Sequence, residues 1–214
     1  MGFPAERIVR TNEEDIITRL AEHFGVTRDE LIHVIKMAVG ARRNTTANNL
    51  RTAPGWYSHD AGTQGLRLIF RAKGWDSLYE NGVEGVFNPE TGMKIIFQNV
   101  YHAADVKNDP RAISAKGAAS IDLIAGAQPD LFIKKPPTSL STEDRGEAWY
   151  LCVSCDENIG VCAELSRPLR LLNKQFADFH ERIFIVKKGE LENVSLDNDL
   201  DMPQQDYDIQ ISRK

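Results

Sequence analysis

Residues 83–120 read VEGVFNPETGMKIIFQNVYHAADVKNDPRAISAKGAAS. Two apolar runs flank a turn at Pro89-Glu90-Thr91-Gly92, and this arrangement is typical of a β-hairpin. The run after the turn, Met93 to Phe97, is almost continuously apolar, which indicates a strand covered on both faces. We therefore expect a buried hairpin, followed by a polar segment at residues 99–120 that lies at one edge of a sheet.

Helices are expected early in the chain and strands later. Asn12 can cap a first helix that ends at Gly25, and Thr27 with Glu30 forms a capping box for a second. A further hairpin is expected from 148–153 to 161–165. Because the strands come as hairpins, the pattern favours an α+β fold, in which an N-terminal helical hairpin packs on a mostly antiparallel sheet with flanking helices. We divide the chain into a helical hairpin (1–45) and an α+β body (46–214) with an exposed connector (134–146) and an acidic C-terminal segment.

Other segments give weaker patterns. Residues 40–60, rich in Asn, Thr, Pro and Gly, are expected to form a loop, followed by a short helix that ends at Gly74. A helix is expected at 169–179, a strand at 182–186 and a last strand at 207–211. Ser114 or Ser120 is expected to cap a helix that stops near Pro129.

The segment LAEHFGVTRDELIHVI (residues 20–35) resembles a DNA-binding helix-turn-helix. Ala21, Gly25 and Val26 stand where that motif needs a small residue, a turn and an apolar residue. The would-be recognition helix begins Arg28-Asp29-Glu30, and its two carboxylates would repel phosphate. A packed helical hairpin explains the same pattern, and both interpretations remain open.

Charge is segregated along the chain. The 214 residues carry a net charge of −5, which argues against broad affinity for phosphate backbones. Acidic residues concentrate near the C-terminus, whereas a basic face is expected from residues of the first half. The candidate nucleic-acid-binding residues are Arg42, Arg43, Arg51, Arg67, Arg71, Lys73, Arg111 and Lys116.

The triplet Asp105-Val106-Lys107 suggests a nuclease site. Nucleases hold a divalent cation between carboxylates beside a lysine, and Glu90 or Glu84 could supply the second acid. His102 completes the candidate catalytic set of Asp105, Lys107, Glu90 and His102. Separately, Tyr101-His102 resembles the nicotinamide-ribose grip of ADP-ribosyltransferases, and this resemblance implies Glu164 as the catalytic acid.

Three further groups allow two interpretations each. Trp56 and Tyr57 either anchor the 40–60 loop on the core, with His59 exposed, or belong to a working surface with His59. The small residues from Ser114 to Ser120 either receive a phosphate at a helix N-terminus or permit tight packing. Cys152, Cys155 and Cys162 are more consistent with buried, reduced thiols than with zinc ligands, because residues three apart on a strand point to opposite faces.

The sequence thus predicts a nucleic-acid-binding protein that uses a basic face and the 101–120 loop, with metal-dependent phosphodiester cleavage as an extension. The alternatives are a non-enzymatic module or inhibitor that engages a protein partner through exposed loops and its acidic tail, and an ADP-ribosyl-transfer enzyme. No cofactor or assigned metal ligand follows from the sequence. We expect a cytoplasmic protein without membrane contact, because no long apolar run or signal peptide is present. A further alternative is self-association through an edge strand at Ile183-Phe184-Ile185.

Overall fold

The computed structural model describes residues 7–126, 146–156 and 159–191. Its helices are α1 (Glu13–Phe24), α2 (Arg28–Arg43), α3 (Ala53–Arg71) and α4 (Ala118–Gly126). Its strands are β1 (Ile8–Arg10), β2 (Asp76–Glu80), β3 (Val83–Phe87), β4 (Lys94–Tyr101), β5 (Arg111–Ala112), β6 (Ala148–Asp156), β7 (Gly160–Leu172) and β8 (Gln175–Val186).

The strands form one mixed sheet in the order β1-β8-β7-β6-β4-β3-β2, with β5 attached to β4. Most neighbours are antiparallel, while β1 with β8 and β4 with β6 are parallel. The predicted α+β class with a mostly antiparallel sheet is confirmed.

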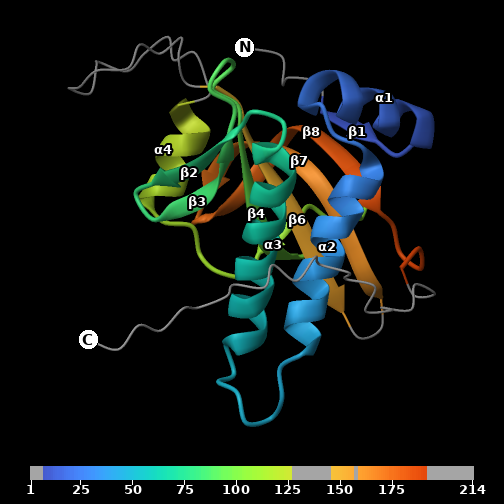
Figure 1. The fold of residues 1–214 in the computed structure, drawn as a ribbon, viewed down its shortest axis with the longest axis vertical. Coiled ribbons are helices and arrows are strands. Elements are labelled where there is room, and N and C mark those ends of the chain that lie inside the picture. Colours follow the sequence, from blue (N-terminus) through green and yellow to red (C-terminus); the bar gives the residue numbers. More distant parts are fainter. Residues whose placement is uncertain (1–6, 127–145, 157–158, 192–214) are drawn as a thin grey trace, which may run out of the picture.

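The sheet carries helices on both faces. In Figure 1, α2 and α3 lie side by side in front of the strands, and the loop that joins them extends beyond the sheet. One core cluster lies between α1, α2, α3 and the sheet, and it includes Leu20, Val34, Leu66, Phe97 and Trp149. A second cluster includes Ile124 of α4 and lies on the other face. The helical hairpin expected at residues 1–45 therefore shares its core with the body.

The opening hairpin is confirmed as β3 and β4. Val86 pairs with Ile95 and Phe87 with Lys94, and Asn88 closes the turn because its backbone N–H donates to the Met93 carbonyl at 2.8 Å. Six consecutive residues of β4, 95–100, are buried, as expected for a strand covered on both faces. The capping residues are also confirmed: Asn12 caps α1, Gly25 ends it with a φ of 65°, and Thr27 and Glu30 form a capping box on α2.

The loop prediction for residues 40–60 was wrong over much of its length. α2 continues to Arg43, and α3 begins at Ala53 with Pro54 in its first turn, where a missing N–H costs nothing. The glycines of α3 lower its helix propensity, but they permit close packing. A Cβ on Gly62 would lie 2.3 Å from the Phe97 ring, and one on Gly65 would lie 3.1 Å from Val34. Tertiary packing therefore overrides local propensity here.

The helix expected at residues 169–179 is a β-hairpin. β7 runs to Leu172 and β8 begins at Gln175, with Asn173 and Lys174 at φ values of 50° and 61° between them. Two successive residues with positive φ are the signature of a type I′ hairpin turn. An Asn-Gly pair would have predicted this turn from the sequence, whereas an Asn-Lys pair does not. The strand expected at 182–186 is the second half of β8.

Two further expectations concern the sheet and α4. Ile183, Phe184 and Ile185 do not lie on an exposed edge, because β8 stands between β1 and β7 and all three are buried. β1 pairs with β8 only from Glu181 to Ile183, so the expected exposure of these side chains was wrong, while self-association stays a prediction. α4 begins at Ala118, so Ser120 lies within its first turn and does not cap it. The connector up to residue 145, Pro129, the strand at 207–211 and most of the acidic tail lie outside the described residues. None of the described helices has the length and apolar content that crossing a membrane requires.

Candidate functional site

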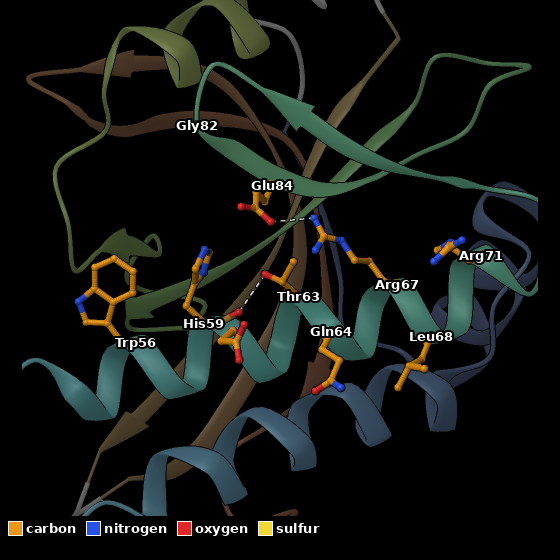
Figure 2. A pocket seen from close by; sticks show the side chains of 10 residues that line it. Trp56, His59, Thr63, Gln64, Arg67, Leu68, Arg71, Gly82 and Glu84 are labelled. Atoms are coloured by element: carbon orange, nitrogen blue, oxygen red, sulfur yellow. Dashed lines mark hydrogen bonds and ion pairs between the residues drawn. The ribbon is translucent and has the colours of Figure 1, made fainter. Parts of the chain in front are cut away.

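A pocket of about 840 Å³ runs along α3, between this helix and the β2–β3 hairpin. We call it the α3 groove. Figure 2 shows Trp56 at one end, Arg71 towards the other, and Gly82 and Glu84 across from the helix. At a rise of about 1.5 Å per residue, the fifteen steps from Trp56 to Arg71 span about 22 Å. The groove is thus long enough for an extended ligand.

The exposures of Trp56 and His59 contradict the interpretation in which Trp56 and Tyr57 anchor the 40–60 segment on the core and His59 is exposed. Trp56 is 71% exposed and Tyr57 is 48% exposed, so neither anchors the segment on the core. His59 is instead partly buried, with its ring centroid 6.1 Å from that of Phe97. Desolvation first, and then the charge of Lys116, lowers the pKa of His59, which favours the neutral imidazole.

Arg67 forms the middle of the groove. Its Nη2 donates to Glu84 Oε2 at 2.8 Å, and its guanidinium lies 4.6 Å from the centroid of the exposed Tyr79 ring. The Nε of Arg67 is buried and has no hydrogen-bond acceptor among the described residues. A buried donor without an acceptor is costly, so this enclosed N–H lowers the stability of the fold.

The expected basic face is smaller than the sequence suggests. Lys73 pairs with Glu30 at 2.9 Å and Arg67 with Glu84 at 2.8 Å, while the amine of Lys116 is buried beside Gln98. Within the described part of the chain, five candidate residues form no ion pair: Arg42, Arg43, Arg51, Arg71 and Arg111. Arg42, Arg43 and Arg51 flank the α2–α3 loop, which we call the hairpin tip (residues 42–52).

The start of α2 is not presented as a recognition helix. Arg28 Nε donates to the Ile185 carbonyl at 2.9 Å, and its Nη2 donates to Glu190 at 2.6 Å. Leu31, Val34 and Ile35 are buried, and α2 packs along α3. The first turn of α2 is therefore occupied by contacts with the body, as in a packed helical hairpin.

Asp105 stabilises its own loop. Its carboxylate accepts the Asn108 amide at 2.6 Å and the Lys107 backbone N–H at 2.8 Å, and these bonds lower the pKa of Asp105. Glu90 lies in the turn before β4, whereas His102, Asp105 and Lys107 follow its end. The eight residues of β4 separate these positions by about 23 Å at 3.3 Å per residue.

The candidate catalytic set therefore does not converge. Glu90 and Asp105 are too far apart to ligate one metal ion, and no three His, Cys, Asp or Glu side chains of the described residues form a metal-binding group. Glu84, the other acid considered, is the partner of Arg67 in the α3 groove.

Glu164, the acid implied by the ADP-ribosyltransferase resemblance, is completely buried. It accepts two hydrogen bonds from Arg182, at 2.8 and 2.5 Å, and others from Ser166 Oγ and the Ala104 backbone N–H. Arg182 also pairs with Asp109 at 3.1 Å. This arrangement ties the 102–110 loop to β7 and β8, and it leaves the carboxylate inaccessible to a ligand.

The cysteines are free thiols, as expected. Cys152 and Cys162 are buried and Cys155 is partly buried. Desolvation raises the pKa of each thiol, to about 11 for Cys162, so the thiols remain protonated near neutral pH.

Sequence reasoning missed the α3 groove because it divided α3 between a loop that ends at Asp60 and a short helix that follows it. A helical reading of 53–71 would have aligned Trp56, Asp60, Gln64 and Arg67 on one face at spacings of three and four. A comparison of the chain with protein-family models, with curated proteins and with solved structures gives no match. The function is therefore argued from this geometry alone.

Proposed function

We propose that the protein binds single-stranded nucleic acid along the α3 groove and the hairpin tip. The observation that carries the proposal is the exposed indole of Trp56, which stands at the mouth of the groove, five residues after the exposed Arg51. Proteins that bind single strands combine aromatic rings, on which bases stack, with cations that follow the phosphates.

The cations and the carboxylates along the groove suit different parts of a nucleic-acid ligand. Arg71 lines the groove and Arg51 precedes α3 by two residues, on the side of Trp56 in the sequence. Neither forms an ion pair with described residues, so both are available to phosphates. Asp60 and Glu84 line the groove and accept N–H groups of bases better than they tolerate phosphate.

The proposal covers binding without cleavage, because Glu90 and Asp105 lie at opposite ends of β4. The proposed ligand is a single strand, since an exposed indole stacks on a base only when that base is unpaired. We therefore expect single strands to bind more tightly than duplexes of the same sequence.

The test is a titration of a labelled single strand of about ten nucleotides, followed by fluorescence anisotropy at several salt concentrations. Stacking on an aromatic ring contributes about 1–3 kcal/mol per base, so Trp56→Ala should weaken binding about fivefold or more. Trp56→Phe should retain part of the affinity. Arg51→Ala should weaken binding of all sequences and reduce the salt slope by about one.

Lys188→Ala is the matched control, since Lys188 is an exposed cation after the end of β8, far along α2 from the hairpin tip. It should bind like the unmodified protein. Absence of binding at low salt, or binding that Trp56→Ala leaves unchanged, would refute the proposal.

A further inference from the structure

Lys116 and His59 contact two consecutive residues of β4 from opposite faces of the sheet. The His59 ring lies against Phe97, while the Lys116 amine donates to the side-chain carbonyl of Gln98. Neighbouring residues on a strand point to opposite faces, so Gln98 and Lys116 lie on the α4 side of the sheet. The charge of Lys116, after desolvation, lowers the pKa of His59.

The Lys116 amine occupies an aromatic site. Its Nζ lies 5.1 Å from the ring centroid of Tyr150 and 5.2 Å from that of Phe176. The backbone N–H of Lys116 donates to the Lys174 carbonyl at 3.0 Å, which fixes the segment that carries the amine. No carboxylate of the described residues pairs with Nζ.

Burial and the aromatic rings act on the amine in opposite directions. The two rings favour the ammonium, since their faces attract a cation. Burial without a carboxylate disfavours it more strongly and lowers the pKa of Lys116 to about 8. The other titratable group that acts on it is Cys152 of β6, whose thiol has a pKa raised by burial. A sizeable fraction of the amine is therefore neutral at physiological pH.

We infer that Lys116 is a nucleophilic amine that forms an imine with an aldehyde-bearing ligand. A nucleophilic lysine needs a free lone pair, a desolvated setting and a fixed position, and Lys116 has no ion pair, two aromatic walls and an anchored backbone. The Gln98 carbonyl accepts one N–H and orients the amine. This inference is independent of nucleic-acid binding in the α3 groove.

The covalent step balances as an ordinary condensation. The Nζ lone pair forms a bond to the aldehyde carbon, and the carbonyl π electrons move to its oxygen. A proton passes from nitrogen to that oxygen to give a carbinolamine, and loss of water leaves the imine. No oxidant or reductant is required for this step.

The test uses glyoxylate as the probe and cyanoborohydride, whose hydride reduces the imine to a stable secondary amine. Each lysine peptide of the full chain is then quantified by mass spectrometry at low conversion. Lys174 is the internal reference, because it is exposed and its carbonyl contacts Lys116. At pH 7 an amine with a pKa of about 8 is about one-tenth neutral, whereas an ordinary lysine with a pKa of about 10.4 is less than a thousandth neutral.

We expect Lys116 to be modified about tenfold or more faster than Lys174 at pH 7. Its rate should rise with pH and level off above about 8. Unfolding the chain in urea should abolish the preference, and Lys116→Arg, which keeps the cation between the rings, should remove the fast phase of total labelling. Equal rates for Lys116 and Lys174 in the folded protein, or a preference that persists in urea, would overturn the inference.

Discussion

At the scale of single residues, Glu164 and Arg182 form the most constrained polar contact of the described chain. Both side chains are fully buried, and the carboxylate receives four hydrogen bonds from Arg182, Ser166 and the Ala104 backbone. Such a pair adds little net stability over apolar residues, but removing one partner leaves the other charge buried and uncompensated. The contact therefore fixes the position of the 102–110 loop.

We predict that Glu164→Gln lowers the free energy of unfolding by about 3–5 kcal/mol, because the buried Arg182 guanidinium loses its two-bond partner and keeps only the half-exposed Asp109 as a counter-ion. Urea denaturation followed by circular dichroism would measure the change. The matched control is Asp178→Asn, which breaks the exposed 2.7 Å pair with Arg170 and should cost less than about 1 kcal/mol. Asn also tolerates the positive φ of Asp178. Equal effects of the two substitutions would contradict the predicted role of burial.

At the scale of elements, α3 organises both the core and the candidate site. Its inner face packs on β4 through Gly62 and along α2 through Gly65, and its outer face provides most of the α3 groove. Gly62 and Gly65 lower the helix propensity of α3, but they let this helix approach β4 and α2 closely.

Gly62→Ala should destabilise the protein although alanine is the better helix former. Alanine gains about 1 kcal/mol in helix propensity over glycine, but its Cβ would stand 2.3 Å from the Phe97 ring. Overpacking of this kind costs about 1–3 kcal/mol, with more at a backbone that cannot shift. Thermal unfolding would measure the difference.

Gly40→Ala in α2 is the control for helix propensity, since nothing lies within 4 Å of the position of its Cβ. It should leave the midpoint unchanged or raise it. Adding Phe97→Leu to Gly62→Ala should recover part of the loss by making room. A stabilised Gly62→Ala variant would show that α3 does not pack on β4 as described.

At the scale of the whole molecule, the N-terminal helices and the sheet share one core. Phe24 of α1 stacks edge-on against Trp149 of β6 at 4.9 Å, and Val34, Leu66 and Phe97 belong to the same cluster. The apolar faces of α1 and α2 therefore have no separate core to stabilise them.

We predict a single cooperative unfolding transition for the full chain. Tryptophan fluorescence, which reports on the buried Trp149, and far-ultraviolet circular dichroism, which reports on the helices, should give the same midpoint in urea. Early loss of helical signal before the fluorescence change would mean that residues 1–45 fold as an independent unit.

The sequence by itself determined the α+β class, the capped helices α1 and α2, and the β3–β4 and β6–β7 hairpins. These features depend on local rules: Asn12 and Thr27 accept backbone N–H groups within one turn, and Pro89 and Gly92 mark a turn between apolar runs. Only the tertiary structure decided that α3 begins at Ala53 instead of after residue 60 and that 169–179 form a hairpin, because packing against Phe97 and pairing within the sheet outweigh local propensity. It also decided which charges are available: Lys73 and Arg67 are paired, Lys116 is buried, and Glu90 and Asp105 lie at opposite ends of β4. The distance between charged residues remote in sequence, and the pairing or burial of a particular charge, depend on the folded chain and are not encoded in a local pattern.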